Sequence, residues 1–573
     1  MRGAPVARRR CWRPQQESNL HLALRRRSFY PLNYGGNWSI VGWRMGGMDM
    51  ERRELLRLMG TAAAAAAGTA PGVFAAPSFK SDPFGLGVAS GSPDHRSVVL
   101  WTRLHDQGLW GSHLPDAPIP VKWEVALDER FGRVLAAGEA MALPELAHSV
   151  HVEAGPLPAN TVMYYRFMAG GAVSPVGRTR SLPAPGDSVA RWRVALASCQ
   201  HYERGYFGAY AHLVNDAPDL VIFLGDYIYE YPPARASIRS VEGSWCLTLA
   251  DYRARYATYR KDPHLQAAHR AAAWCLTWDD HEVQNDYAGT QAGNRGPVVA
   301  DFIARRSAAY QAYYEHMPLR PSVLVQGLQR LQQGGELRLY AHHRIGRLVN
   351  LSLLDNRQYR HPQVCTANGE LGSSGVDRAA CAALRDPARS LLGATQEQWL
   401  LRQHPAGDAR WNLLANATLF GQRVYGSATR QRVSNDGWDG YPLARQRIID
   451  HFAAMRENNL LVIGGDIHEN WIGHVLQDYD QPRSESVGAE FCVGAVASYR
   501  SNASVLETRR RLNPHFVYGD SGVEGYGLLD LMPDSVEMRV RAVDDSRNKD
   551  PGIRTAAAFR IQQGQARLES LAG

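Results

Sequence analysis

The sequence predicts a two-domain protein of the α/β class (an α+β arrangement of two domains), in which a β-sandwich precedes a larger α/β domain. The chain has 573 residues, more than one hydrophobic core usually organises. Residues 82–185 contain short β-type runs separated by turn residues. From residue 191 onward, apolar runs typical of buried strands alternate with amphipathic helical stretches. Hydrophobic residues make up 45% of the chain and charged residues 21%, which excludes a largely disordered chain.

Residues 1–47 differ from the rest of the chain in charge. They hold nine arginines and one acid, Glu17. The whole chain has a formal charge of +8, but outside this segment 55 basic and 55 acidic side chains remain. We therefore infer no nucleic-acid partner and no membrane attraction from the charge. We interpret residues 1–47 as a start assigned too early, with Met48 or Met50 as the true start, or as a disordered tail. A basic RNA-binding arm is the alternative.

Residues 48–76 have the layout of a secretory signal. Arg52-Arg53 precede Leu55-Leu56 and an alanine-rich stretch, and small residues lead to Ala76-Pro77. The stretch is too short and too rich in alanine for a stable membrane anchor. The arginine pair indicates twin-arginine (Tat) export, so the Tat export machinery is an expected partner and the periplasm or the exterior the expected location. A soluble alanine-rich helix is the alternative.

Residues 80–184 form the predicted N-terminal β-sandwich. Runs rich in β-forming residues occur at the spacing of a sandwich, over 97–102, 121–125, 148–152 and 164–167. The segment contains no cluster of candidate ligands, so we prefer a structural or substrate-shaping role for it. A stretch with proline and glycine over 181–186 is the predicted linker.

Residues 190–545 form the predicted α/β domain, and residues 546–573 a C-terminal extension. Five apolar strands in the α/β domain end in polar or ionisable residues. These strands span 194–197, 220–224, 274–278, 348–354 and 460–463. In open α/β sheets, ligands bind outside the carboxyl ends of the strands. The five strand ends can therefore converge on one site.

The residues at these strand ends are types that bind metal ions. They are Cys199, Asp226, Tyr229, Asp280, His281, Asp466 and His468. A thiol, a phenol, imidazoles and carboxylates together suit a transition metal beside a harder cation. Asp226 lies on a tight glycine turn, where a carboxylate can bridge two ions about 3.5–4 Å apart. Each motif alone is more often an ordinary turn, helix cap or core residue, but their order along apolar strands favours a metal site.

The cysteines are too few for a disulfide scaffold, because the chain has only seven. Cys365 and Cys381 flank a loop rich in glycine and serine and can pair. Cys246 and Cys275 are a second possible pair, and spacing alone decides neither case.

The order of the motifs resembles that of the calcineurin-like metallophosphoesterases, and in detail that of the PhoD-type alkaline phosphatases. The matching segments include Ser198-Cys199-Gln200, Gly225-Asp226-Tyr227-Ile228-Tyr229-Glu230, Trp278-Asp279-Asp280-His281-Glu282-Val283, Asp355-Asn356-Arg357-Gln358-Tyr359-Arg360 and Gly465-Asp466-Ile467-His468. The resemblance covers nearly all of residues 82–540. It implies a β-sandwich followed by a four-layer αββα metallophosphoesterase domain.

The resemblance also implies a ferric ion (Fe3+) and one or two calcium ions (Ca2+) as cofactors. By motif position, the iron ligands are Cys199, Asp226, Tyr229 and His468. Asp226 bridges to a calcium that is also held by Asp466 and by a residue of the Asp280 or Asn285 region. Gln284-Asn285-Asp286 departs from the Asn-Asn that family members often carry after this motif.

The activity implied by the resemblance is that of a secreted alkaline phosphatase acting on phosphate esters of small molecules or polymers. In-line attack of a metal-activated oxygen releases inorganic phosphate, with His281 near the leaving oxygen as acid or electrostatic donor. We expect Arg357 to grip phosphate oxygens; a salt bridge to a ligand-supporting carboxylate is the alternative. The functional alternatives are a phosphodiesterase or phospholipase D-like hydrolase on the same metal centre, and an inactive secreted binding module.

Overall fold

The computed structural model describes residues 78–106, 114–427, 429–457, 459–481, 483–499, 503–565 and 567–571. All of these residues belong to one compact unit that spans residues 50–573. The expectations for residues 1–47 and 48–76 fall outside the described residues. Within the described ranges, no helix combines the length and apolar character that crossing a membrane requires.

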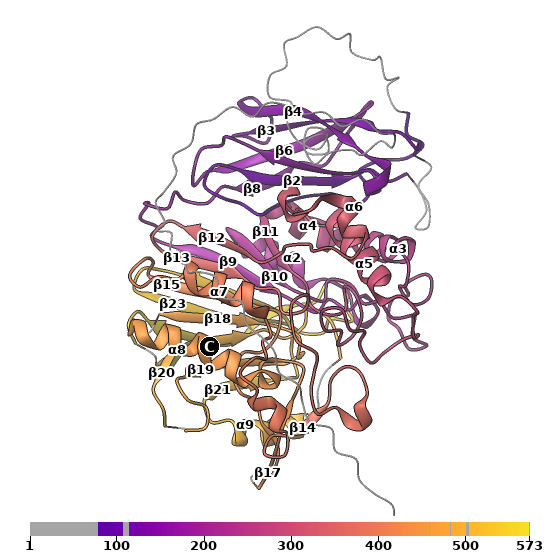
Figure 1. Ribbon diagram of the computed structural model, residues 1–573. Helices are drawn as coiled ribbons and strands as arrows, with labels where there is room; N and C mark the ends of the chain where they lie inside the picture. The colour runs from indigo at the N-terminus through magenta and orange to yellow at the C-terminus, as the bar shows by residue number, and fades with distance from the viewer. Residues whose placement is uncertain are drawn as a thin grey trace, which may run out of the picture. The chain divides into compact units, whose positions relative to one another are not determined.

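The largest sheet has ten strands in the order β25-β24-β23-β22-β9-β10-β11-β1-β2-β5 (Figure 1). Its strands are β1 (Val88–Gly91), β2 (Val98–Arg103), β5 (Ser149–Ala154), β9 (Trp192–Ala197), β10 (Leu220–Leu224), β11 (Ala273–Thr277), β22 (Glu524–Leu531), β23 (Ser535–Val543), β24 (Ile553–Gln562) and β25 (Leu568–Ser570). The three central strands β9, β10 and β11 run parallel, and residues of β9 and β10 are almost all buried. Burial on both faces explains their nearly continuous apolar sequence.

A second sheet has seven strands in the order β12-β13-β15-β18-β20-β19-β21. Its strands are β12 (Ala341–Ile345), β13 (Val349–Leu353), β15 (Trp411–Ala415), β18 (Leu460–Gly464), β19 (Asn470–Leu476), β20 (Ser486–Cys492) and β21 (Phe516–Asp520). Strands β13, β15 and β18 are parallel neighbours. The five strands predicted to end at the site are therefore all present, three in one sheet and two in the other.

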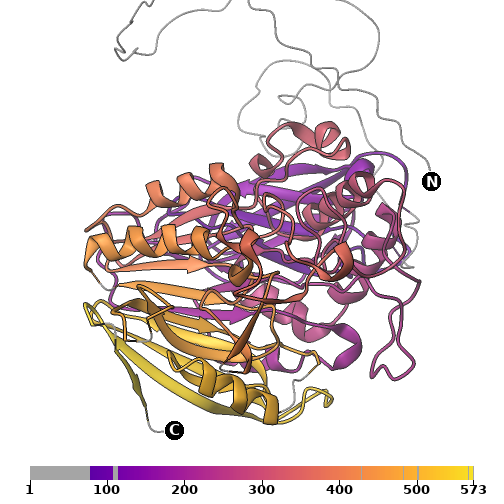
Figure 2. The same cartoon turned by 60° about the horizontal axis from the view of Figure 1, so that its bottom comes forward.

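Helices cover the outer faces of both sheets. The ten-stranded sheet is covered by α2 (Ala209–Asn215), α3 (Leu249–Arg260), α4 (Pro263–Ala271) and α5 (Phe302–His316), whose residues share one hydrophobic cluster with β9, β10 and β11. The seven-stranded sheet is covered by α7 (Gly393–Gln403) and α8 (Pro442–Met455), which form a cluster with β15 and β18 (Figure 2). This arrangement confirms the four-layer αββα architecture.

Local sequence explains where the covering helices begin. Thr248 caps α3 because its side chain accepts a hydrogen bond from the amide of Asp251, whose carboxylate accepts one from the amide of Thr248. Asp262 caps α4, and Pro263 occupies the first turn, where its missing amide hydrogen costs nothing.

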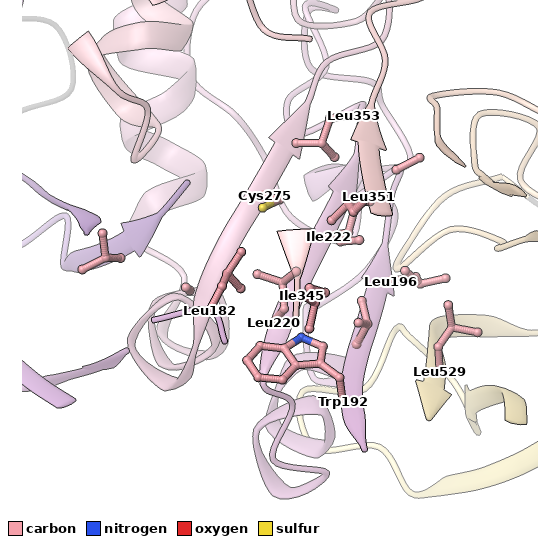
Figure 3. Packing of buried hydrophobic residues seen from close by; sticks show 14 of the residues in the cluster. Leu182, Trp192, Leu196, Leu220, Ile222, Cys275, Ile345, Leu351, Leu353 and Leu529 are labelled. Atoms are coloured by element: carbon pink, nitrogen blue, oxygen red, sulfur yellow. The ribbon is translucent and has the colours of Figure 1, made fainter. Parts of the chain in front are cut away.

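The space between the two sheets is the main hydrophobic core. Figure 3 shows Leu196, Leu220 and Ile222 from the ten-stranded sheet beside Leu351 and Leu353 from the seven-stranded sheet. These side chains are at most 3% exposed. Because each sheet buries one face here and the other face under helices, both sheets are held firmly, and their strand ends form a rigid base for a site.

The N-terminal segment is a sandwich that shares a sheet with the α/β domain. Strands β1, β2 and β5 extend the ten-stranded sheet, and β1 pairs in parallel with β11. The facing sheet is built from β4-β3-β6-β7, with β8 pairing β6 (Figure 1). Its strands are β3 (Ile119–Ala126), β4 (Val134–Ala142), β6 (Val162–Ala169), β7 (Ala172–Val173) and β8 (Gly177–Arg180). Hydrogen bonding between strands thus continues across the domain boundary that the change in sequence pattern predicts.

Three smaller features complete the described chain. The stretch 546–573, predicted as an extension, contributes β24 and β25 to the edge of the ten-stranded sheet. A small sheet is formed by β14 (Gly375–Asp377), β17 (Arg430–Ser434) and β16 (Tyr425–Ser427). The remaining helices are α6 (Gly327–Gln332) and α9 (Ala503–Leu512).

Candidate metal centre

One group of side chains that could hold a metal ion gathers at the ends of β9, β10 and β18. Ligand atoms of Cys199, Asp226 and His468 lie within 4.8 Å of one another. The phenol of Tyr229 joins them, because its oxygen lies 3.0 Å from Oδ2 of Asp226 and 3.2 Å from Nε2 of His468. The structure therefore brings together all four residues that the motif order assigns to iron.

A second group shares one member with the first. Ligand atoms of Asp226, Asp280 and His281 also lie within 4.8 Å of one another. Asp280 and His281 follow β11, the neighbour of β10 in the ten-stranded sheet. Asp226 is therefore in position to bridge two cations.

The backbone of these loops is held in an unusual conformation. Cys199, Asp226, Asp466 and His468 all have positive φ angles, between 54° and 70°. Non-glycine residues rarely adopt this conformation, and it concentrates at functional sites. Position 225 requires glycine, because its φ is +106° and a Cβ there would lie 2.6 Å from Cβ of Asp279.

Buried polar groups brace the donor loops. Glu282 accepts hydrogen bonds from the amides of Tyr227 (2.7 Å) and Asp279 (2.9 Å), which joins the β10 loop to the β11 loop. Thr418, after β15, donates to Oδ2 of Asp466 at 2.6 Å. Such partners orient metal ligands and hold them in one rotamer.

His281 is held by a buried carboxylate. Its Nδ1 lies 2.8 Å from Oε2 of Glu230, which is fully buried. Burial lowers the pKa of His281, but Asp280, Asp226 and Glu230 outweigh it and raise that pKa well above its usual value. The contact with the carboxylate of Glu230 favours a proton on Nδ1, and Nε2 is the second ring nitrogen.

The donor set fits a bound cation. Oδ1 of Asp226 is buried and has no hydrogen-bond partner. Burial, together with Asp280, Asp279 and Glu282, raises the pKa of Asp226 well above its usual value even against His281. Burial and Asp226 likewise raise the pKa of the Cys199 thiol well above its usual value. A cation in this position satisfies the orphaned oxygen and stabilises both anions, so the residues present suit a metal.

Arg357 adopts the salt-bridge arrangement and not that of a phosphate clamp. Its side chain is 1% exposed. Its Nε lies 2.6 Å from Oδ1 of Asp279, and its Nη2 lies 2.9 Å from Oδ2 of Asp436 and 3.7 Å from Asp280. The guanidinium of Arg357 is thus paired with carboxylates. Arg357 therefore holds the loop that carries Asp279 and Asp280 in place.

Two further predicted ligands, Asn285 and Asp466, have hydrogen-bond partners of their own. Oδ1 of Asn285 accepts a hydrogen bond from the hydroxyl of Tyr231 at 2.8 Å, and its Nδ2 donates to Asn294. Asp466 is bound to Thr418 and is not a member of either group. Asn285 therefore positions a neighbouring aromatic ring in this structure.

Several supporting residues are not among the predicted site residues. Glu230 and Glu282 lie in the predicted motifs and both accept hydrogen bonds at the site. Strand β15 and Thr418 lie outside the predicted set. The signal was present, because Trp411–Ala415 is an apolar strand that ends in Asn416-Ala417-Thr418, the same pattern as the five strands found.

A disulfide ties down a loop that reaches the site. Cys365 and Cys381 are bonded, which confirms the first possible pair. Within this loop, Ser373 donates from its amide and hydroxyl to Oδ2 of Asp286, whose own amide donates to Asp280. Cys246 and Cys275 are free and buried, because they belong to clusters on the two faces of the ten-stranded sheet.

Two packed sheets with a buried thiol, carboxylate, phenol and imidazole at their strand ends define a candidate metal-dependent hydrolase. Comparison with known proteins agrees with this class. The family model described as "PhoD-like phosphatase" matches residues 194–540, and that of the "PhoD-like phosphatase, N-terminal domain" matches residues 67–183. Alkaline phosphatase D of Bacillus subtilis (strain 168) is 42% identical over 507 residues, which is 87% of this chain and 84% of the relative.

The same family is found among solved structures. A structure described as "Structure of PhoD" superposes with a TM-score of 0.80 at 41% identity, and the match covers 87% of this chain and 94% of that chain. The chain therefore belongs to the PhoD-like phosphatases, which confirms the resemblance drawn from its motifs. It is a phosphoric ester hydrolase of mixed α/β fold.

Proposed function

We propose that the chain is an exported, metal-dependent alkaline phosphatase that hydrolyses phosphate esters and releases inorganic phosphate. The observation that carries the proposal is the pair of donor groups that share Asp226, with an oxygen that has no hydrogen-bond partner. Two cations held by a shared carboxylate would stabilise the attacking and leaving oxygens of an in-line displacement at phosphorus. The likeness to alkaline phosphatase D supports the same activity.

The two groups suit different cations. A thiol, a phenol and an imidazole beside Asp226 favour a ferric ion, whereas the oxygens of Asp226 and Asp280 favour calcium. A bound pair of cations supplies Lewis acidity toward the phosphoryl oxygens. Asp466 stays a proposed calcium ligand because its second oxygen is not used by Thr418. Asn285 is not proposed as a ligand, since its carbonyl oxygen binds Tyr231.

His281 is the proposed proton donor to the leaving oxygen. The bond from Nδ1 to Glu230 fixes the orientation of the ring and leaves Nε2 free for the substrate. Asp280, Asp226 and Glu230 raise the pKa of the imidazole above its usual value, which favours the protonated form that a proton donor needs. Arg357 positions Asp279, Asp280 and Asp436.

Phosphate release tests the activity. Purified protein is stripped of metal, reloaded with ferric and calcium ions singly and together, and assayed on phosphate monoesters and diesters. We expect turnover only in the reloaded protein, with both ions giving the highest rate. Full activity after complete stripping would contradict the metal requirement. Turnover of diesters alone would replace the phosphatase proposal with the phosphodiesterase alternative.

The role of His281 is tested by the leaving group. We expect His281→Gln to slow a phosphate ester of a poor leaving group, such as an alkyl alcohol, about a hundredfold more than 4-nitrophenyl phosphate, because nitrophenolate leaves without a proton. The matched control is His264→Gln, on the partly exposed surface of α4. Equal losses on both esters would contradict proton donation.

Export is a separate proposal that rests on residues 48–76. We propose that Arg52-Arg53 direct the chain to the Tat machinery and thus to the periplasm or the exterior. Cell fractionation of the wild type and of Arg52→Lys with Arg53→Lys tests it. Unchanged export of the double variant would contradict a Tat signal.

A further inference from the structure

Two aromatic side chains stand beside the proposed proton donor. The ring of Tyr231 lies 5.0 Å from the ring of His281, nearly perpendicular to it at 76°. The indole of Trp245 contacts Tyr231 in turn, at 5.4 Å and 88°. Both rings are partly exposed, whereas His281 and its other ring contact, Tyr229, are buried. The rings of Tyr231 and Trp245 therefore lie between the buried His281 and solvent.

Core packing does not account for this pair. Neither Tyr231 nor Trp245 belongs to any hydrophobic cluster of the described residues, although Cys246, next to Trp245, does. Tyr and Trp are enriched at binding interfaces, because each combines a large apolar ring with a polar group.

Both rings are held in place without a ligand. The hydroxyl of Tyr231 donates to Oδ1 of Asn285 at 2.8 Å, and Asn285 donates to Oδ1 of Asn294 at 3.0 Å. The indole of Trp245 rests on Gly296, where φ is +92° and a Cβ would lie 3.0 Å from the ring. Fixed rings lose little conformational freedom when a ligand binds, which strengthens binding.

We propose that Tyr231 and Trp245 bind the leaving group of the substrate and favour alcohols that carry a flat ring. The inference rests on the proposed function, in which Nε2 of His281 faces the leaving oxygen. The ring that adjoins His281 and is partly exposed is that of Tyr231. The group attached to the leaving oxygen then extends past this ring toward solvent. Planar groups stack on aromatic rings, and open alkyl chains gain less from them.

Two esters of primary alcohols separate ring recognition from leaving-group chemistry, namely benzyl phosphate and butyl phosphate. For the metal-loaded enzyme, we expect Trp245→Ala to raise KM for benzyl phosphate about tenfold. KM for butyl phosphate stays within about twofold, and kcat for both esters is unchanged, because the metal centre and His281 are untouched. Trp245→Phe, which keeps a flat ring, restores most of the selectivity.

The matched control is Trp399→Ala, a tryptophan of similar partial exposure on α7, which we expect to leave the benzyl-to-butyl ratio unchanged. Thermal unfolding shows whether Trp245→Ala is folded, and Trp245→Leu serves if it is not. Equal changes in KM for both esters, or none, would overturn the inference and leave the phosphatase proposal intact. Failure of the wild-type, metal-loaded enzyme to hydrolyse either ester would overturn both.

Discussion

Two clusters of buried charge adjoin each other in this protein and differ in how the charge is balanced. In one, Asp279, Asp280 and Asp436 surround Arg357, and Arg360 adds a second positive charge at 3.3 Å from Asp436. In the other, Asp226 gathers with Cys199, Tyr229 and His468, and among the described residues Asp226 forms no ion pair with an arginine or lysine.

The pKa values of Asp436 and Asp226 show the consequence of this difference in charge balance. Burial raises the pKa of Asp436, but Arg357 and Arg360 outweigh it, and the pKa lies below its usual value. Burial raises the pKa of Asp226 too, and Asp280, Asp279 and Glu282 raise it further. In the arginine-centred cluster, Arg357 also helps to hold the pKa of Asp280 below its usual value. It does not outweigh burial at Asp279, whose pKa is raised. Arginines thus compensate part of the acidic charge in this cluster, whereas among the described residues no arginine or lysine pairs with Asp226. A folded chain tolerates such an unbalanced anion at a functional site because binding compensates for it.

Removing the shared carboxylate is the strongest way to break this comparison. We expect Asp226→Asn to lower kcat at least about a thousandfold and to abolish binding at both cation positions, because each depends on Asp226. Elemental analysis and phosphate release measure the two effects. Asp550→Asn, where the side chain is 90% exposed, serves as the control. A variant that stays active and metal-replete would show that Asp226 is no bridge.

Removing the positive charge of Arg357 tests the cluster that surrounds this arginine. We expect Arg357→Met to destabilise the protein by about 3–5 kcal/mol, since it leaves buried carboxylates without their partner. Denaturant unfolding measures the loss. The matched control Arg347→Met, at an exposed arginine, stays within about 0.5 kcal/mol of the wild type. A fully stable Arg357→Met with a raised KM would instead indicate a phosphate clamp.

The pH dependence of stability distinguishes the metal-free protein from the loaded one. Burial raises the pKa of Asp466 to about 6, above its value in the unfolded chain. Its contribution to the metal-free protein is therefore complete below about pH 4 and is lost as the pH rises through about 6, on the order of 2 kcal/mol. A bound cation needs ionised ligands, so the loaded protein gains stability over the same range. Parallel slopes for the two forms would contradict an external cation.

The smallest expected effect concerns the brace on Asp466. Thr418→Val removes the hydroxyl that donates to Asp466 at 2.6 Å. We expect calcium affinity to fall about tenfold with little change in the fold, as for other partners of metal ligands. Calcium titration of the iron-loaded protein measures the affinity. The control is Thr395→Val, at an exposed position on α7. An unchanged affinity would place calcium away from Asp466.

Much of the fold and the donor set could be predicted from the sequence because the relevant signals are local. Strands β9, β10, β11, β13 and β18 are apolar runs that end in polar residues, and that pattern needs no tertiary information. The same strand ends supplied Cys199, Asp226, Asp280, His281 and His468, which the structure gathers in two groups. Strand β15 carries the same local signal, so it too can be predicted from the sequence.

The roles of Arg357 and Asn285 could not be predicted in the same way. Both follow or adjoin motif residues, so position along the chain favoured contact with phosphate for one and with calcium for the other. Their partners, Asp436 and Tyr231, lie 79 and 54 residues away in the sequence. Which side chain meets which is settled only when distant loops pack together.

The sequence by itself determined the α/β class of the larger domain, the strand ends that form the site and the kinds of donor they carry, whereas the four layers followed from its resemblance to a family. Periodicity and residue chemistry are properties of short segments, which is why these features can be read without a fold. Only the tertiary structure decided that β1, β2 and β5 extend the ten-stranded sheet, that Asp226 is shared between two groups, and that arginines pair with one acidic cluster and not with Asp226 beside it. Strand pairing, burial and charge balance depend on contacts between residues far apart in the chain, and a linear pattern does not contain them.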